Sequence, residues 1–435
     1  MTDLDLRDLR HLPDPFEVEP VGHPLEATVR VPGSKSLTNR ALVAAALARG
    51  PSVLRGALQA DDTEAMVDGL RGLGVEVRPD WATDTIEVEG CAGRPPAEVG
   101  IVDARLSGTT SRFLLPVAAL GSGTYRVDGG VPLRARPMGP ALDALRRLGV
   151  TVAEVGEPGH LPVDLSGGPV RGGAVDVPGD TSSQFLSGLL LAAPAMAEGL
   201  EVWLTTELVS RPYVEMTAAV VRAFGGDVAE SAGSAWVVAP SGYAGTDHRI
   251  EPDASAASYF FAAAAICGGR VTVEGLGDAS LQGDLAFVDV LARMGARVER
   301  GADAVTVEGT GTLHGVEADL ADLSDTAQTL AAVAVYADSP TRITGIGFIR
   351  NKETDRIGAT VAELTRCGVQ AVEEPDGMVV WPGSPRPATV ETYDDHRMAM
   401  SFAVLGLRAP GIRIADPGCV AKTFPGFWAT LATLA

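Results

Sequence analysis

The fold is decided by the stretch Leu70-Arg-Gly-Leu-Gly-Val-Glu-Val77, because closely similar stretches return along the chain. Four further copies begin at positions 145, 221, 291 and 364, so the successive spacings are 75, 76, 70 and 73 residues. Each copy combines the end of an amphipathic helix, a glycine that stops the helix in the left-handed region, and the start of a strand. A fixed period of this length indicates one supersecondary unit that is used repeatedly.

The first copy predicts what the unit contains. In order, it has a strand at Ala27–Val31, a helix at Leu37–Ala48, a strand at Val53–Arg55, a helix at Thr63–Leu73, and strands at Val75–Val77 and Thr85–Val88. The unit is therefore strand-helix-strand-helix-strand-strand, and the chain holds six of them. The sixth lacks its last strand, which we expect the N-terminal segment Phe16–Pro20 to supply.

The predicted fold class is α/β, with two similar domains of three units each. A chain of 435 residues exceeds what one hydrophobic core usually holds, so two domains are expected from length alone. A solenoid is the alternative architecture. Apolar helices such as Phe185–Ala193 argue against it, because they need burial on several sides.

Composition and charge exclude several classes of function. A net charge of −21 argues against nucleic acid or a membrane as a partner, and any site for an anionic substrate must gather its cations locally. The N-terminal sequence lacks the order of a signal peptide, and apolar runs such as Tyr259–Cys267 are too short to span a bilayer.

The dispersed cysteines (Cys91, Cys267, Cys367 and Cys419) favour a reduced, cytoplasmic protein. No metal-ligand spacing or dinucleotide fingerprint is present, so we expect no metal and no cofactor. We also expect a monomer whose partners are small-molecule substrates.

Charged motifs open four of the predicted helices. They are Gly33-Ser-Lys-Ser36 with Arg40, Asn351-Lys-Glu-Thr-Asp-Arg356, Asp394-Asp-His-Arg-Met-Ala-Met400 and Ala421-Lys-Thr-Phe-Pro-Gly426. Free N–H groups and the positive end of the helix dipole favour anions at such positions. Any one motif alone is more typical of a capped helix start on the surface. All four together predict a site for anionic substrates.

With these four motifs in this order, the sequence resembles one family, the 5-enolpyruvylshikimate-3-phosphate synthases. The resemblance extends from about Glu26 to Gly426. The resemblance implies an inside-out α/β barrel in each of two domains, one of residues 1–32 and 252–435 and the other of 33–251. It implies transfer of the enolpyruvyl group of phosphoenolpyruvate to the 5-hydroxyl of shikimate-3-phosphate, with release of phosphate, in aromatic amino-acid biosynthesis. It also implies that glyphosate competes with phosphoenolpyruvate.

The resemblance further implies a role for each site residue. Asp325 is expected to take the proton from the 5-hydroxyl, Glu353 to exchange protons with the enolpyruvyl carbon, and Lys35 to touch both substrates. The residues expected to bind shikimate-3-phosphate are Lys35, Ser36, Arg40, Ser182, Ser183, Gln184, Ser210, Asp325 and Lys352. Those expected to bind phosphoenolpyruvate are Lys35, Gly108, Arg136, Gln184, Arg356, Arg397 and Lys422. Because the cations come from both halves of the sequence, closure is expected to assemble the site.

The residues by themselves leave alternatives open. A surface helix cap is the ordinary role of an aspartate placed like Asp325. A structural ion pair is an equal alternative for Arg112, and His396 is expected to orient Arg397 or its helix rather than to transfer protons. The role of Arg211 stays open.

The sequence departs from the family pattern at three places. Leu106 and Phe113 stand where the family has Asn and Pro around Gly108, so the strength of glyphosate competition is not predicted. Phe348 stands where the family has an Asn, and Asn351 is the candidate to replace its hydrogen bond to substrate.

Two other functions are compatible with a repeat of this kind. The related transferase that acts on UDP-N-acetylglucosamine carries a Cys on a loop where this chain has Leu120–Tyr125, which contains none. A non-catalytic sugar-phosphate binding module would not need Asp325, Glu353 and Lys35 together. The sequence therefore favours the shikimate enzyme.

Overall fold

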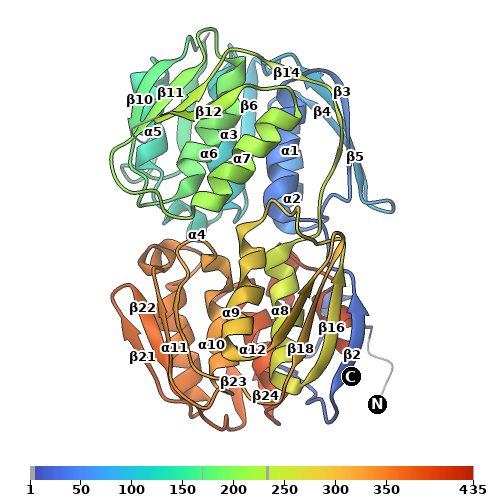
Figure 1. Ribbon diagram of the computed structural model, residues 1–435. Helices are drawn as coiled ribbons and strands as arrows, with labels where there is room; N and C mark the ends of the chain where they lie inside the picture. Colours follow the sequence, from blue (N-terminus) through green and yellow to red (C-terminus); the bar gives the residue numbers. More distant parts are fainter. Residues whose placement is uncertain (1–4, 169, 232–234, 435) are drawn as a thin grey trace. The chain divides into compact units, whose positions relative to one another are not determined.

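The computed structural model describes residues 5–168, 170–231 and 235–434, and the chain forms two compact units (Figure 1). The middle unit comprises Gly33–Glu251, and the terminal unit comprises Met1–Pro32 together with Pro252–Ala435. Each unit has its own hydrophobic core. Helices and strands alternate along the chain, which confirms the predicted α/β class.

Three sheets surround the core of the middle unit. Along each sheet the first pairing of strands is parallel and the next two are antiparallel. The first sheet contains β14 (Tyr243–Ala244), β15 (Asp247–Arg249), β3 (Ala48–Arg55), β5 (Thr85–Cys91) and β4 (Glu76–Asp80). The second contains β6 (Val99–Asp103), β7 (Thr124–Asp128), β9 (Val163–Ser166) and β8 (Thr151–Glu154). The third contains β10 (Gly173–Val177), β11 (Leu200–Leu204), β13 (Ala235–Val238) and β12 (Val228–Ser231).

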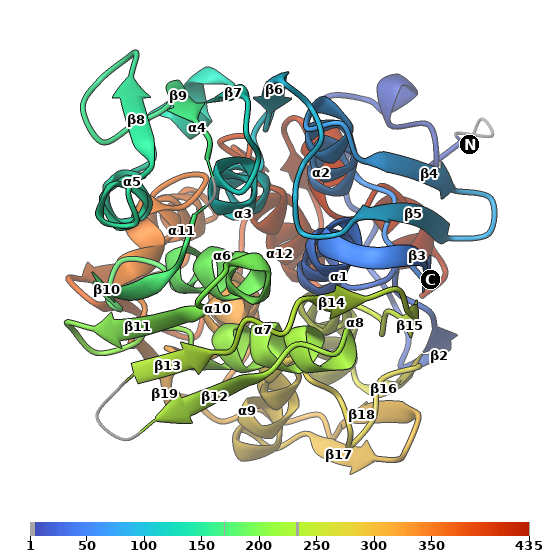
Figure 2. The ribbon, with the colours of Figure 1, turned by 90° about the horizontal axis from the view of Figure 1, so that it is seen from above.

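Helices fill the inside of the middle unit. The three core helices are α1 (Lys35–Leu47), α3 (Gly108–Ala119) and α6 (Ser183–Ala192). Every residue of α3 is buried, and a helix without a polar face must be covered on all sides. The core helices pack against one another, with the sheets outside them (Figure 2). The remaining helices of the unit are α2 (Asp61–Gly72), α4 (Val131–Arg134), α5 (Gly139–Arg147) and α7 (Arg211–Ala223).

The terminal unit repeats this plan. Its first sheet contains β2 (Leu25–Val29), β16 (Gly269–Glu274), β18 (Ala304–Gly309) and β17 (Arg297–Arg300). Its second contains β19 (Glu317–Asp319), β20 (Thr341–Thr344), β22 (Gly377–Val380) and β21 (Ala371–Glu374), and its third contains β23 (Ala388–Val390), β24 (Ile412–Ile414) and β1 (Phe16–Glu17). The core helices are α8 (Ala254–Cys267), α10 (Ala327–Ala334) and α12 (His396–Gly406), and the others are α9 (Phe287–Met294), α11 (Arg356–Arg366) and α13 (Phe427–Ala432). Six sheets in the described residues match the six predicted units.

One helix stop explains why the stretch that begins at Leu70 recurs. The glycine of each copy (Gly74, Gly149, Gly225, Gly295 and Gly368) has a positive φ between 78° and 113°. The residue after each glycine donates its N–H, at 2.8–3.0 Å, to the carbonyl of the first residue of the copy. This is a Schellman motif, which satisfies carbonyls that the helix end leaves open. The sequence period is therefore the repeat of one helix stop.

The first strand of the first repeat belongs to the terminal unit. The strand predicted at Ala27–Val31 is β2, and it pairs in parallel with β16 of the terminal unit, with Ala27 opposite Val271. The parallel neighbours of β3 are instead β14 and β15, which come from the end of the middle unit. A sequence period gives the order of elements along the chain, and it cannot tell which strands pair when the chain leaves a unit and returns.

The N-terminus completes the last sheet, as predicted. Phe16 of β1 lies opposite Ile414 of β24 in an antiparallel pair, so the segment supplies the strand that the sixth unit lacks. Strand β20 ends at Thr344, and a 3₁₀ turn (η5, Gly347–Asn351) lies between it and α11. Within the described ranges, none of the helices combines the length and the apolar character needed to cross a membrane.

Candidate functional site

A buried network of charges in the terminal unit joins most of the predicted catalytic residues. Arg356, the first residue of α11, is only 2% exposed, and its guanidinium donates to three carboxylates. It bonds to Asp395 at 2.7 and 3.2 Å, to Asp325 at 3.1 Å and to Glu353 at 2.9 Å. Charge-assisted bonds of this kind are strong and directional. The network therefore fixes three acidic side chains around one cation.

Asp325 is not the surface cap that its type suggests. It lies in a short 3₁₀ turn (η4, Ser324–Thr326) ahead of α10, and the N-cap of α10 is Thr326. One carboxylate oxygen accepts from Arg356 and the other from Arg397. Arg397, in the first turn of α12, is itself only 5% exposed. Two guanidiniums thus set the direction of one carboxylate.

The electrostatics of this network depend on its burial. Burial alone would lower the pKa of Arg356, but Asp395, Glu353 and Asp325 outweigh it and raise the pKa above its ordinary value. Burial also raises the pKa of Tyr259 to about 12, and its hydroxyl accepts a hydrogen bond from Arg397 at 3.5 Å. The guanidinium of Arg356 therefore stays charged at any physiological pH.

Glu353 belongs to the same network, and two predicted ligands, Lys422 and Lys352, lie in the same unit. The Lys422 ammonium, at the end of the 3₁₀ turn η6 (Pro417–Lys422), lies 4.0 Å from a carboxylate oxygen of Glu353. Lys352 is half-buried, and its ammonium lies 5.9 Å from the ring centroid of Phe348. Phe348, which stands in place of the family Asn, therefore supports Lys352 by a cation–π contact. Asn351 is exposed.

In the middle unit, Lys35 and Ser36 occupy the first turn of α1. Ser34 is the N-cap, and its hydroxyl accepts the N–H of Leu37 at 3.4 Å. The Lys35 ammonium lies 3.3 Å from Asp62 in the first turn of α2, and both side chains are largely buried. The carboxylate of Asp62 therefore orients the ammonium group of Lys35. Asp62 is not among the predicted site residues, because an acid in the first turn of a helix is ordinary.

Arg40 lies deeper than a typical ligand. It is 2% exposed, and its guanidinium donates to Thr217 at 2.7 Å, to the Ser36 carbonyl at 2.9 Å and to the Tyr213 carbonyl at 3.0 Å. It also lies 5.2 Å from the ring centroid of Phe113, the residue that replaces the family Pro. Burial lowers the pKa of Arg40 to about 10. Arg40 thus joins α1 to α7 and fixes the chain at Ser36.

Gly108 and Arg136 are direct neighbours. A Cβ on Gly108, the first residue of α3, would lie 2.9 Å from Nη1 and 3.0 Å from Cζ of Arg136. The absent side chain therefore lets the guanidinium lie against the start of α3. Arg136 is 7% exposed. Leu106, the other departure from the family pattern, is half-buried and packs against Gly130.

Hydroxyl and amide groups collect at the start of α6. Ser182 is its N-cap and accepts the N–H of Gln184 at 3.3 Å, while Ser183 is buried in the first turn. The Gln184 carbonyl oxygen accepts from Arg112 at 2.7 Å, and its amide nitrogen donates to Thr109 at 3.2 Å. The bond from Arg112 assigns that residue a role the sequence left open, because it orients the side chain of Gln184.

Three other residues have clear placements. Ser210 is the N-cap of α7, with a left-handed φ of 53°, and is buried. Arg211 forms ion pairs with Glu215 of α7 and Glu230 of β12, and all three side chains are partly exposed. His396 is buried, with Nδ1 3.7 Å from an oxygen of Asp395. Asp395 is also absent from the predicted site residues, although it belongs to the Asp-Asp-His-Arg motif and that motif could have pointed to it.

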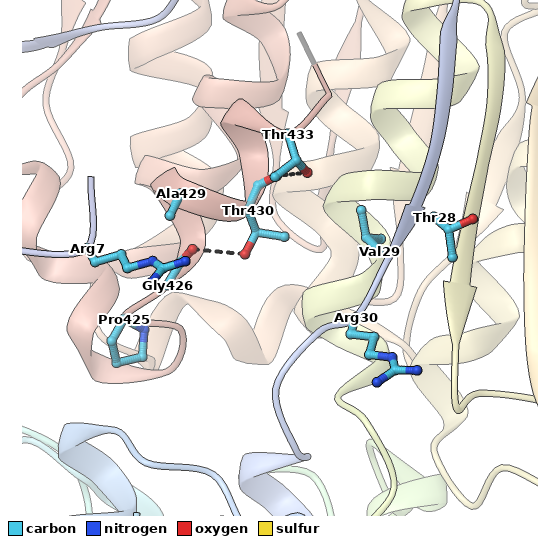
Figure 3. Close-up of a pocket in the computed structure, with 9 residues that line it drawn as sticks. All are labelled: Arg7, Thr28, Val29, Arg30, Pro425, Gly426, Ala429, Thr430 and Thr433. Carbon is cyan, nitrogen blue, oxygen red and sulfur yellow. Dashed lines mark hydrogen bonds between the residues drawn. The ribbon is translucent and has the colours of Figure 1, made fainter. Parts of the chain in front are cut away.

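A separate pocket of about 520 Å³ opens on the terminal unit between β2 and α13, with Arg7 and Arg30 at its rim (Figure 3). None of the predicted site residues lines it. In the parts of the chain that the structure describes, no three His, Cys, Asp or Glu side chains are grouped as metal ligands would be.

Known proteins resemble this chain over nearly its full length. A model of the family described as EPSP synthase (3-phosphoshikimate 1-carboxyvinyltransferase) matches residues 20–431. A 3-phosphoshikimate 1-carboxyvinyltransferase of Nostoc sp. is 44% identical over 416 residues, which is 95% of this chain and 98% of the relative. One of Methanoculleus marisnigri is 45% identical over 410 residues, which is 94% of this chain and 96% of the relative.

Solved structures agree in fold. An EPSP synthase from Acinetobacter baumannii superposes with a TM-score of 0.82 at 27% identity, and the match covers 97% of this chain and 98% of that one. The family model and the relatives both cover nearly the whole chain, and the chain belongs to the EPSP synthase family.

Proposed function

We propose that this protein transfers the enolpyruvyl group of phosphoenolpyruvate to the 5-hydroxyl of shikimate-3-phosphate and releases phosphate. The proposal rests on one observation: Arg356 and Arg397 both donate hydrogen bonds to the carboxylate of Asp325, within a buried network of charges. A group that must accept a proton from one defined hydroxyl needs a fixed direction, and two guanidiniums supply it. Family membership gives the proposal its reaction.

The chemistry requires a base, an acid and positive charge. Protonation of the methylene carbon of phosphoenolpyruvate makes the adjacent carbon electrophilic, and the 5-hydroxyl adds to it as it loses its proton. The tetrahedral adduct then expels phosphate, and loss of a proton from the methyl group restores the double bond. Asp325 is proposed as the base for the hydroxyl and Glu353 as the group that gives and takes the carbon-bound proton.

Preorganised cations account for most of the proposed acceleration. Arg356, Arg397 and Lys422 each already lie beside a carboxylate, so the reaction does not have to gather them from water. We propose that they hold phosphoenolpyruvate together with Lys35 and Arg136. Gly108 supports this set because it lets Arg136 approach the start of α3. Gln184 is proposed to contact both substrates.

The shikimate-3-phosphate set is proposed to be mostly hydroxyl and amide. Ser182, Ser183, Gln184 and Ser210 all lie at helix starts, where side-chain and backbone donors can bind a phosphorylated ring. Lys35, Ser36, Asp325 and Lys352 complete the set with Arg40. Arg40 also donates to the Ser187 hydroxyl at 3.5 Å, so its bonds within the protein use four of the five N–H donors of a guanidinium. The protein is further proposed to work as a cytoplasmic monomer.

One assay tests the proposal. Purified protein is mixed with phosphoenolpyruvate and either shikimate-3-phosphate or UDP-N-acetylglucosamine, without added metal, and phosphate release is measured. We expect release only with shikimate-3-phosphate, and competition by glyphosate against phosphoenolpyruvate. Release only with UDP-N-acetylglucosamine would assign the related transferase reaction instead. Release with neither acceptor would refute the enzyme activity.

A further inference from the structure

Glu363 is a fully buried carboxylate that the proposed reaction does not use. It lies on α11, two turns after Arg356, and its side chain has no exposed surface. It accepts from Arg366 at 2.8 and 3.2 Å, from the Glu391 N–H at 3.0 Å and from the Tyr393 hydroxyl at 2.7 Å. A buried charge is costly unless its lone pairs are satisfied, and here four donors meet the two oxygens. The last two donors belong to the loop ahead of α12.

That loop has an unusual backbone. Tyr393 and Asp394 are consecutive residues with positive φ, 56° and 57°, and neither is a glycine. Left-handed conformations cost free energy for such residues and persist only when surrounding contacts hold them. The bonds from Glu391 and Tyr393 to Glu363 are contacts of that kind. The next residues in the chain are Asp395, which caps α12, and then His396 and Arg397.

A single face of α11 contacts the start of α12 at three levels. Arg356, Thr360 and Glu363 are spaced i, i+4 and i+7, so they lie on one side of the helix. Arg356 bonds to Asp395, the Thr360 hydroxyl lies 3.5 Å from the sulfur of Met398, and Glu363 holds the preceding loop. Glu363 therefore holds the loop 391–394, and this loop sets the position of the first turn of α12.

We propose that Glu363 is a positioning residue for phosphoenolpyruvate binding, acting through the loop 391–394 on Arg397 and Asp395. The inference rests on the proposed function, because it takes Arg397 as a ligand of phosphoenolpyruvate. Without the Glu363 carboxylate, the loop relaxes from its left-handed backbone and the first turn of α12 shifts. Small displacements of a binding group cost much of its effect, because the reacting geometry is narrow.

Two substitutions test the proposal, with a matched control. Glu363→Gln keeps the size of the side chain, but its amide nitrogen would face donors where an oxygen now accepts. Tyr393→Phe removes one hydroxyl bond to Glu363 at a partly exposed site, and stays informative if Glu363→Gln fails to fold. The control is Tyr336→Phe, which removes a hydroxyl bond at 2.6 Å to the Leu405 carbonyl, near the other end of α12. KM for each substrate, kcat and Tm are measured, with phosphoenolpyruvate affinity by calorimetry.

For Glu363→Gln we expect kcat/KM for phosphoenolpyruvate to fall roughly 10- to 100-fold. KM for shikimate-3-phosphate should stay near that of the parent protein. Tyr393→Phe should show a smaller fall in the same direction, and Tyr336→Phe should lower only Tm. A residue that merely stabilised the fold would lower Tm and leave KM unchanged, so unchanged phosphoenolpyruvate kinetics and affinity in the folded variants would overturn the proposal. If the parent protein lacks activity, the proposed function fails, and calorimetry with phosphoenolpyruvate alone still decides whether Glu363 positions its binding.

Discussion

Asp325 allows the sharpest test at the scale of single residues. Asp325→Asn keeps the size of the side chain but cannot take the hydroxyl proton, so kcat should fall roughly 10²- to 10⁴-fold. Binding of either substrate should change much less, because Arg356 and Arg397 remain. Single-turnover kinetics and calorimetry measure the two effects separately. Asp322→Asn, an exposed acid three residues away, is the matched control. A near-normal rate in Asp325→Asn would transfer the role of base to another residue.

Gly108 should be sensitive to a single methyl group. In Gly108→Ala the new Cβ would lie about 3 Å from the Arg136 guanidinium, which must then move away from the start of α3. We expect KM for phosphoenolpyruvate to rise by about tenfold while KM for shikimate-3-phosphate changes little. Gly139→Ala is the control, since nothing lies within 4 Å of a Cβ placed there. Equal kinetics in the two variants would exclude Arg136 from phosphoenolpyruvate binding.

The site residues differ in how far the sequence could reveal them. Asp325, Glu353 and Arg356 lie in compact motifs whose order along the chain is distinctive, so they could be predicted from the sequence. Asp62 and Glu363 could not, because a single acid on an amphipathic helix is ordinary and neither lies in a distinctive motif. Their importance comes from partners far away in sequence, 27 residues for Asp62 and Lys35 and 30 for Glu363 and Tyr393. Such contacts are set by the tertiary fold.

At the scale of elements, the ends of helices could be predicted from the sequence, whereas the partners of most strands could not. The glycine stops predicted the ends of five helices, because the Schellman motif depends only on neighbouring residues. The place of β2 depends on where the chain passes between sheets, and the residues of Ala27–Val31 suit any buried sheet edge. Its true partner, β16, lies more than 200 residues later in the sequence.

The 3₁₀ turn η6, which carries Lys422, should respond to pH through Asp416. Burial, together with the nearby Asp394 and Asp14, raises the pKa of Asp416 above its ordinary value of 3.8. In the unfolded chain Asp416 loses its proton near pH 3.8, whereas in the folded protein it keeps the proton up to the raised pKa. Folding stability therefore falls as pH rises through this window, and the loss persists at higher pH. Asp416→Asn should therefore raise Tm at pH 7 and lose that advantage near pH 3.5. An equal change in Tm at both pH values would contradict the charge-based cause.

For the whole molecule, the route of the chain makes the two units unequal. The middle unit is one continuous segment, and all the strands of its sheets lie within Gly33–Glu251. The terminal unit needs its N-terminal segment, which supplies β1 and β2 and buries Val18, Leu25 and Val29. Each buried aliphatic side chain is worth about 1.5–3 kcal/mol, a large share of the roughly 5–15 kcal/mol that holds a domain folded.

The two units should therefore differ when they are expressed separately. Residues 33–251 should fold alone and melt cooperatively, whereas residues 252–435 should not, because β16 would lose β2 and β24 would lose β1. The decisive control joins residues 1–32 directly to residues 252–435 through a few glycines. The Pro32 carbonyl already accepts the Asp253 N–H at 2.8 Å, so a short link suffices and folding should return. Circular dichroism melting and amide NMR dispersion report the outcome. A cooperative transition in residues 252–435 alone would show that β1 and β2 are dispensable, and that the N-terminal segment adds only its own local contacts.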